Sequence, residues 1–294
     1  MWRVACWCVC AAAASAAAAQ SSPTRIRAID CDRPSAPNTP TLSWRGDVVQ
    51  RAEWSVVLGA RGIANRVIVV RMPSSRVRFS LEIAHDGSTV LPWSLLQTPS
   101  DAAVAVNAGQ FTDDGPWGWV VHRQREQQAP GVGPLSGAFV VDSAGAVALL
   151  LSNEIATWRS PLRAVEAVQS YPVLLVGEGR APRALCDVAG GLDLAHRDAR
   201  LAIGITADAR VLLVLSRYQV PGGSPTNIPI GPTTPEMAEL MRRLGADRAM
   251  MLDGGLSAQM LVRTTRDTVR YSGWRSVPLA LVARLREPPQ RTLK

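Results

Sequence analysis

The 294-residue sequence almost lacks lysine, since 31 of its 32 basic residues are arginine and Lys294 is the last residue. It therefore offers no plausible Schiff-base lysine and no phosphate-loop lysine. The formal net charge is +8, but the arginines are spread along the chain instead of forming a stripe. This distribution indicates no nucleic-acid partner. At 47% hydrophobic residues the chain can bury a sizeable core.

Long apolar runs are also scarce, and the one that stands out is at the N-terminus. Arg3 supplies a positive charge, residues 4–19 are apolar and alanine-rich, and residues 17–19 form a small-residue cleavage site before Gln20. This pattern predicts a signal peptide over residues 1–19 and a mature protein that is periplasmic or secreted. No later run is long enough to span a bilayer, so no integral membrane segment is expected after cleavage.

Two cysteines remain once the predicted signal peptide is removed, Cys31 and Cys186. In an oxidising compartment the two can form a disulfide, and two free buried thiols fit the sequence equally well. The sequence alone leaves this choice open.

Short β-rich runs separated by turn residues dominate the rest of the sequence. The runs at residues 54–59, 65–72 and 77–84 predict a meander of antiparallel strands. The one predicted helix begins at Thr233, a capping residue followed three positions later by a glutamate, and ends before Gly245.

These patterns predict an α+β fold, a single domain of mixed, mostly antiparallel β-sheets with few helices. We expect an extended N-terminal arm at residues 20–52, the folded domain at residues 53–284 and a C-terminal tail at residues 285–294. The arm is rich in proline, serine and threonine and has few large apolar residues.

One apolar run, residues 248–252, ends abruptly at Asp253, Gly254 and Gly255, with Ser257 shortly after. A strand buried on both faces delivers its next residue to a sheet edge, which places the Asp253 carboxylate there. The glycines lack the Cβ atoms that would keep a ligand away from the backbone. The alternative is a tight turn whose aspartate bonds its own backbone.

Three other polar or aromatic positions have two readings each. Asn107 follows the apolar strand at residues 102–106 and fits either a ligand contact or a turn residue. Trp117 fits either a sugar-stacking platform or core packing. Arg200 begins an inner strand, where its guanidinium can clamp a phosphate or pair with a neighbouring carboxylate.

Five short motifs occur in the order and spacing of one family: Asn107-Ala-Gly-x-Phe111, Gln169-Ser-x-Pro172, Arg200-x-Ala-Ile-Gly204, Thr233-x-Pro-Glu236 and Asp253-Gly-Gly-x-Ser257. Over roughly residues 53–284 the sequence resembles the phosphodiester glycosidase family. That family includes the lysosomal uncovering enzyme, which removes N-acetylglucosamine from mannose-6-phosphate diesters, and the resemblance is closer to its secreted bacterial relatives. Many members have glycines where this chain has Ser170 and Tyr171, so a narrower or differently shaped site is expected.

The resemblance implies an active site built from strand ends. The catalytic candidates are Asp253, Arg200, Asn107 and Glu236, with Asp114 as the other candidate for a second carboxylate. The residues expected to contact substrate are Gly109, Phe111, Gln169, Tyr171, Gly254, Gly255, Ser257 and Trp117. No cofactor is predicted, and the need for a metal is left open.

The expected activity is hydrolysis of a sugar-1-phosphodiester in an envelope or extracellular glycan. Asp253 is suited to stabilise an oxocarbenium-like centre, and Arg200 is suited to neutralise the departing phosphate. Two alternatives use the same residues: a carbohydrate-binding or envelope polysaccharide assembly module without turnover, and an exo-glycosidase acting on uncharged linkages.

Overall fold

The computed structural model describes residues 23–32, 39–83, 93–133, 136–187, 193–220, 223 and 225–286. The predicted signal peptide at residues 1–19 lies outside the described residues, as does the predicted tail from residue 287 onward.

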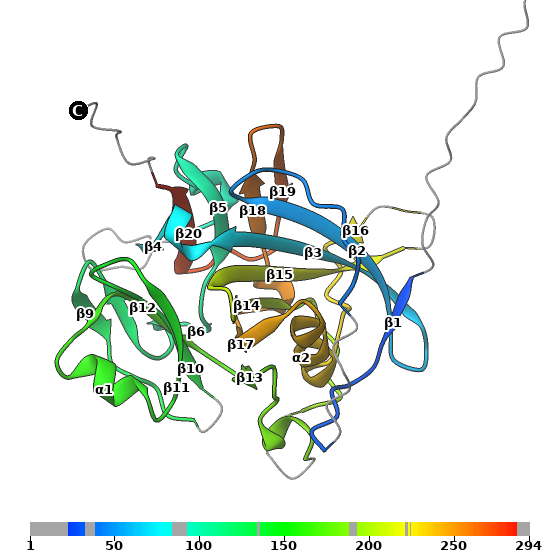
Figure 1. The fold of residues 1–294 in the computed structure, drawn as a ribbon, viewed down its shortest axis with the longest axis horizontal. Helices are drawn as coiled ribbons and strands as arrows, with labels where there is room; N and C mark the ends of the chain where they lie inside the picture. Colours follow the sequence, from blue (N-terminus) through cyan, green and yellow to red (C-terminus); the bar gives the residue numbers. More distant parts are fainter. Residues whose placement is uncertain are drawn as a thin grey trace, which may run out of the picture.

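The largest sheet has eight strands and combines β1 to β3 from the N-terminal part of the chain with β13 to β17 (Figure 1). All its strand pairs are antiparallel except β1 with β2. In spatial order its strands are β1 (Thr24–Ile26), β2 (Gln50–Leu58), β3 (Ile63–Pro73), β15 (Arg210–Gln219), β14 (Leu201–Thr206), β17 (Ala246–Met251) and β13 (Val173–Val176), with β16 (Pro225–Thr226) beside β15.

Two five-stranded antiparallel sheets and a two-stranded ribbon complete the β structure. One five-stranded sheet is ordered β11 (Val147–Leu151), β10 (Gly137–Asp142), β12 (Ala164–Ser170), β8 (Val120–His122) and β9 (Arg125–Gln128). The other is ordered β19 (Thr268–Tyr271), β18 (Met260–Arg263), β5 (Ala102–Asn107), β20 (Leu279–Leu285) and β4 (Val77–Ile83). The ribbon joins β6 (Phe111–Thr112) to β7 (Gly115–Pro116).

The eight-stranded sheet is buried on both faces, which explains why its strands are apolar without alternation. On β3, Ile68 and Val70 pack into the core shared with the other sheets, whereas Val67 and Val69 pack into the core beneath helix α2 (Thr234–Arg243). The predicted fold class is confirmed: the chain is a single, mainly antiparallel β domain with few helices.

Helix α2 is the predicted helix and is confirmed in detail, because Thr233 and Glu236 form the expected capping box. A shorter helix, α1 (Ile155–Arg159), was not anticipated, and the remaining helical segments are 3₁₀ turns at η1 (Ser74–Arg76), η2 (Leu95–Gln97), η3 (Arg183–Leu185) and η5 (Gly255–Ser257). In the part of the chain that the structure describes, none of the helices has the length and apolar character to cross a bilayer.

The predicted meander is wrong in its last strand. β2 and β3 pair as expected, but β4 leaves the sheet through η1 and pairs with β20 from the other end of the domain. The turn residues before β4 mark a change of direction without specifying its partner, which is set by packing between sheets.

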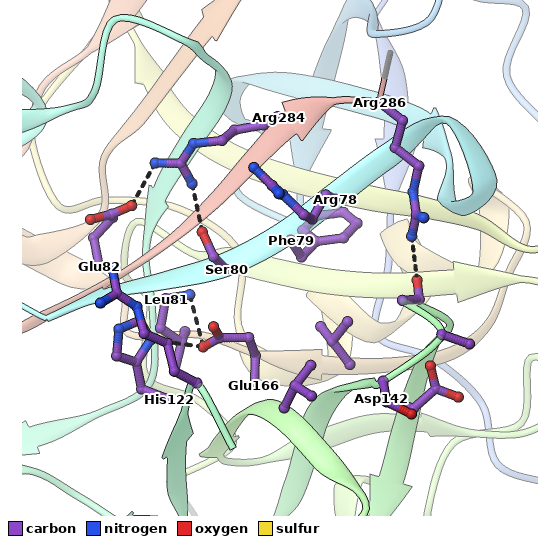
Figure 2. Close-up of a pocket in the computed structure, with 16 residues that line it drawn as sticks. Arg78, Phe79, Ser80, Leu81, Glu82, His122, Asp142, Glu166, Arg284 and Arg286 are labelled. Atoms are coloured by element: carbon purple, nitrogen blue, oxygen red, sulfur yellow. Dashed lines mark hydrogen bonds and ion pairs between the residues drawn. The ribbon is translucent and has the colours of Figure 1, made fainter. Parts of the chain in front are cut away.

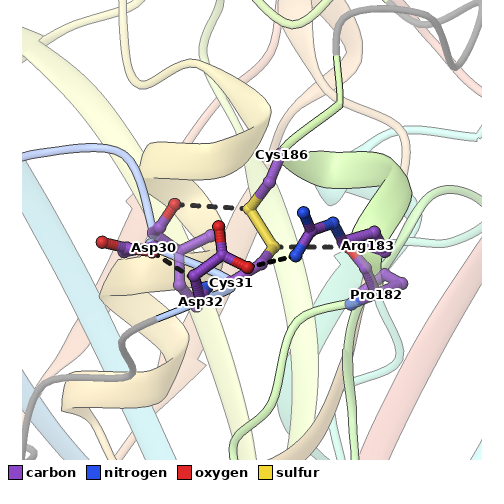
Figure 3. The surroundings of a disulfide bond; sticks show 7 residues. Asp30, Cys31, Asp32, Pro182, Arg183 and Cys186 are labelled. Atoms are coloured by element: carbon purple, nitrogen blue, oxygen red, sulfur yellow. Dashed lines mark hydrogen bonds and ion pairs between the residues drawn. A yellow bond between two sulfur atoms is a disulfide. The ribbon is translucent and has the colours of Figure 1, made fainter.

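Cys31 and Cys186 form a disulfide with their Cα atoms 6.2 Å apart, so the structure decides the choice that the sequence left open (Figure 3). The bond joins the N-terminal arm to η3, and an ion pair between Asp32 and Arg183 lies beside it. The arm also adds β1 to the large sheet and supplies the start of β2 at Gln50, inside the segment expected to be extended.

Candidate active site

Four strand ends meet at one edge of the structure, and Asp253 lies there. The chain continues from β17 through Leu252, whose N–H donates to the carbonyl of Leu201 at the start of β14 (2.9 Å). The N–H of Met251 donates to the carbonyl of Pro172, just before β13. The N–H of Asp253 lies 3.4 Å from the carbonyl of Ala108, just after β5. Asp253 therefore sits where these elements converge.

Asn107 fixes the backbone around Asp253. Its side chain is fully buried; Nδ2 donates to the carbonyl of Asp253 (2.8 Å) and Oδ1 accepts from the N–H of Gln259 (2.9 Å). Both ends of the amide are thus bound to the loop that carries the candidate carboxylate. In this structure Asn107, predicted to be catalytic, positions the backbone of the loop, because both its polar atoms bond to backbone groups.

The carboxylate of Asp253 is only partly satisfied. Its Oδ2 is buried and has no hydrogen-bond partner among the described residues. Burial raises the pKa of Asp253 to about 6 and the charge of Asp198 acts in the same direction, while hydrogen bonds from Ser257 and Gly254 and the charge of Arg275 oppose the rise. A buried acceptor without a donor costs free energy. The site therefore favours a ligand that supplies a donor or a positive charge at this oxygen.

Gly254 and Gly255 are needed for a different reason from the one that the sequence predicted. A Cβ on Gly254 would lie 2.7 Å from the carbonyl oxygen of Ala199, and one on Gly255 would lie 2.8 Å from Oδ2 of Asp198. Gly255 also has φ of +58°, in the left-handed region. The glycines thus admit the neighbouring segment, residues 198–199, instead of clearing space for substrate.

That close approach brings Asp198, which the sequence analysis did not select, next to the site. Its Oδ1 accepts from the N–H of Ala199 (2.8 Å), and its Oδ2 lies 3.6 Å from Nε2 of His196. Burial is the main cause of the raised pKa of Asp253, and the charge of Asp198 adds a smaller contribution in the same direction. The only sequence signal for it was its place two residues before Arg200, in a motif chosen for the arginine.

Glu236 does not supply the second carboxylate. It is 3% exposed, its two oxygens accept from the guanidinium of Arg197 (2.7 and 2.8 Å), and Oε2 also accepts from the N–H of Thr233 (3.0 Å). Helix capping and ion pairing occupy both oxygens of Glu236, which gives this predicted catalytic residue a structural role in the fold. Asp114, the other candidate, lies exposed on the turn between β6 and β7.

Arg200 precedes β14 and uses its guanidinium to join two loops. Nε donates to the carbonyl of Pro232 (3.2 Å) and Nη2 to the carbonyl of His196 (2.9 Å), and burial lowers its pKa. It forms no ion pair with a carboxylate of the described chain. Neither sequence reading of Arg200, phosphate clamp or carboxylate partner, describes these bonds.

A more open cation is Arg275, which sequence reasoning missed. Its side chain is 57% exposed, its guanidinium lies 4.7 Å from the ring centre of Phe111 and 4.0 Å from Asp113, and its charge reaches Asp253. Phe111, expected to contact substrate, is thus the support for an arginine at the mouth of the site. An arginine after Gly273 in a polar loop gave no pattern that would have singled it out.

The remaining predicted contacts divide into a framework and a rim. Gln169 was expected to contact substrate, but its side chain is fully buried. Its Oε1 accepts from the backbone N–H groups of Trp119 (2.7 Å) and Gly131 (2.9 Å), so Gln169 holds these two backbone segments together. Gly109 lies against it, because a Cβ there would be 2.5 Å from the Gln169 carbonyl. Trp117 and Tyr171 make an edge contact with ring centres 5.1 Å apart, and Tyr171 is 41% exposed.

No group of three or more His, Cys, Asp or Glu side chains in the described ranges is arranged to hold a metal ion. The described residues also contain two larger cavities, of about 530 and 920 Å³, and neither is lined by Asp253, Asp198 or Arg275. The candidate active site therefore rests on the side chains that meet at the strand-end edge, with Oδ2 of Asp253 buried among them.

Comparison with known families relates the chain, including the strand ends around Asp253, to a family of known chemistry. Residues 100–284, well over half of the chain, match the phosphodiester glycosidase family. The chain belongs to the phosphodiester glycosidase family. This membership confirms the resemblance read from the five motifs and supports a glycosidase-type function with a sugar-type substrate.

Two solved structures share the fold of this chain at low sequence identity. The zebrafish N-acetylglucosamine-1-phosphodiester alpha-N-acetylglucosaminidase catalytic domain, auto-inhibited by its pro-peptide, has a TM-score of 0.60 and 16% identity, covering 88% of this chain and 87% of that one. A hypothetical protein from Synechocystis has a TM-score of 0.59 and 16% identity, covering 85% of this chain. The match spans 64% of the Synechocystis chain, just under two thirds of its length. No curated protein sequence matches this one.

Proposed function

We propose that this protein is an exported hydrolase that cleaves the glycosidic bond of a sugar-1-phosphodiester, with Asp253 as the carboxylate at the anomeric carbon. The observation that carries the proposal is the buried, unpartnered Oδ2 of Asp253 at the strand-end edge. An oxocarbenium-like centre supplies the positive charge that this oxygen lacks.

The neighbouring groups fit the other requirements of the reaction. The bond from the anomeric carbon to the phosphate oxygen breaks, its electron pair leaves with the phosphate, and a water oxygen bonds to the carbon while a water proton passes to Asp198. Arg275, supported by Phe111, is placed to offset the phosphate charge. Because a phosphate monoester is a good leaving group, no protonated acid is needed on its oxygen, so the commitment of Glu236 to Arg197 does not weaken the proposal.

Export is part of the same proposal. It is supported by the order of charge, apolar run and small residues over residues 1–19, and by the Cys31–Cys186 disulfide, a bond that persists in oxidising compartments. N-terminal sequencing of the native protein should find the mature chain starting at or near Gln20. An intact Met1 in most molecules would remove the periplasmic or secreted assignment.

Turnover measurements on two kinds of substrate test the proposed chemistry. The protein should hydrolyse a sugar-1-phosphodiester and leave a plain aryl glycoside nearly untouched, because only the diester supplies the anionic leaving group that Arg275 stabilises. Equal rates on both would indicate an exo-glycosidase for uncharged linkages. Saturable sugar binding with no turnover of either would indicate a binding or assembly module.

A further inference from the structure

The cavity of about 530 Å³ lies away from the candidate active site, where β4, the end of β20 and the turns β8–β9 and β10–β11 meet. Figure 2 shows three of its arginines along one side and His122, Glu166 and Asp142 along the other. Phe79, Val141 and Val165 add an apolar part to the lining. This volume and mixture of apolar and polar groups are typical of sites for small molecules.

The cavity gathers four arginines from separate parts of the chain: Arg78, Arg123, Arg284 and Arg286. Arg78 and Arg284 are direct partners in the register of β4 and β20. Like charges placed opposite each other on neighbouring strands destabilise the pair, so the arrangement calls for a counter-charge. Counter-charge is present for only one of these two residues.

Arg284 is the satisfied member. Its Nη2 donates to Glu82 (2.7 Å), its Nε to Asp101 (2.8 Å) and its Nη1 to Ser80 (2.6 Å). The side chain of Arg78 makes no hydrogen bond or ion pair within the described residues. It also lines the neighbouring cavity of about 920 Å³, whose carboxylates, Asp47 and Asp101, form no ion pair with it.

The other carboxylates of the wall are occupied by neutral or histidine partners. Glu166 accepts from the N–H of Leu81 (3.2 Å), and the same oxygen lies 3.0 Å from Nδ1 of His122. Asp142 accepts from the N–H of Ala146 (2.8 Å). Neither carboxylate comes within ion-pair distance of an arginine in the described parts of the chain, and Glu82 is used by Arg284.

The remaining two arginines are similarly without carboxylates. Arg286 donates to the carbonyls of Val77 and Gly145 (both 2.9 Å), which fixes its guanidinium at the rim while leaving its charge unmatched. Arg123 lies exposed on the β8–β9 turn and makes no hydrogen bond or ion pair with the described residues. Three guanidinium groups thus line one cavity without an ion pair among the described residues. Together with Arg284 they exceed its carboxylates, Glu82, Asp142 and Glu166, by one positive charge.

We propose that this cavity binds a phosphate dianion held by Arg78, Arg123 and Arg286. Planar guanidinium forks match phosphate oxygens, and two or three of them balance two negative charges. The volume greatly exceeds that of a phosphate ion, so a group attached to the phosphate, such as a sugar, also fits the cavity. The same chemistry fits free phosphate and the phosphate of a sugar monoester, and affinity measurements separate these sources.

The test is calorimetric titration of the full chain with inorganic phosphate and, separately, with a hexose 6-phosphate. The variant Arg78→Gln/Arg123→Gln removes two exposed side chains that make no hydrogen bond with the described residues, so it should fold. Arg27→Gln/Arg61→Gln is the matched control, because it removes two exposed arginines elsewhere with the same change in net charge. Melting curves verify that both variants are folded.

The parent protein and the control should bind phosphate with equal affinity, and the cavity variant should bind at least tenfold more weakly. A tighter complex with the hexose phosphate would assign the phosphate to a sugar, and equal affinities would assign it to the free ion. The proposal is overturned if the cavity variant binds like the parent, if the control loses as much affinity, or if the parent shows no saturable binding. If only Arg275→Gln lost phosphate binding, the anion would lie at the Asp253 edge, and the proposal for this cavity would also be overturned. The turnover measurement on Asp253→Asn does not depend on any of these binding results.

Discussion

Glu236 and Asp253 are carboxylates that border the same short segment, residues 197–200, and they differ in what surrounds them. Arg197 reaches Glu236 and saturates it, whereas Asp198 reaches Gly255 and adds a second negative charge beside Asp253. The pairing of Glu236 and the added negative charge beside Asp253 both arise from adjacent residues, Arg197 and Asp198, because these two side chains contact different neighbours. Burial is therefore common to both carboxylates. What distinguishes Asp253, the carboxylate that we propose to be reactive, is an Oδ2 without a hydrogen-bond partner among the described residues.

The difference predicts a separation of effects: changes at Asp253 should remove activity and spare the fold, and changes at Glu236 should do the reverse. Asp253→Asn is nearly isosteric and keeps an acceptor for Ser257. It should lower turnover of a sugar-1-phosphodiester at least a hundredfold, about 3 kcal/mol of transition-state stabilisation. Turnover close to the parent rate in a folded variant would reduce Asp253 to a turn residue.

The stability of the same variant has a defined sign. Burial raises the pKa of Asp253 to about 6 in the folded protein, against an ordinary value of 3.8, so the folded state holds the proton more tightly. Stability from this group is present at low pH and is lost as the pH rises from about 4 to 6, because the ionised carboxylate is buried. Melting curves of Asp253→Asn should therefore match the parent near pH 4 and lie at or above it at pH 8, by at most about 3 kcal/mol.

Glu236→Gln should lower the free energy of unfolding by about 2 kcal/mol, because it leaves Arg197 without its partner and weakens the cap of α2. Denaturant titration measures this loss, and turnover per folded molecule should stay within threefold of the parent. Glu178→Gln is the matched control, since its ion pair with Arg180 is exposed and should contribute nothing measurable. A large loss of turnover with unchanged stability would return Glu236 to the catalytic group.

Arg275→Gln should raise KM for the phosphodiester about tenfold, roughly 1.4 kcal/mol, because the variant keeps hydrogen-bond donors and loses the charge. Arg270→Gln, which removes an exposed arginine on β19, should leave the kinetics unchanged. Unaltered KM in the Arg275 variant would transfer phosphate recognition to another cation at this edge.

The smallest effect concerns pH. If Asp253 acts as its carboxylate, kcat should fall about fourfold between pH 8 and pH 5.5, because protonation at a pKa of about 6 leaves roughly a quarter of the sites ionised at pH 5.5. The measurement is a pH–rate profile of the parent with a stability check at each pH. A flat profile down to pH 4.5 would contradict an essential carboxylate with this pKa.

Local sequence signals predicted the elements better than their partners. The α2 cap at Thr233 and Glu236 follows from hydrogen bonds three residues apart, so sequence was enough to find it. The pairing of β4 with β20 joins residues roughly two hundred positions apart, and no local pattern specifies it. No local pattern specified the disulfide either, because the sequence showed two cysteines and only the fold brought Cys31 and Cys186 together.

The site divides along the same line. The sequence by itself determined the family, the capped helix and a buried strand that ends at Asp253, because those depend on residue type and short-range spacing. Only the tertiary structure decided that Asn107 and Gln169 hold backbone, that Glu236 belongs to Arg197, and that Asp198 and Arg275 face Asp253. The physical reason is that a polar side chain acts through whatever partner it meets, and those partners come from segments distant in the chain.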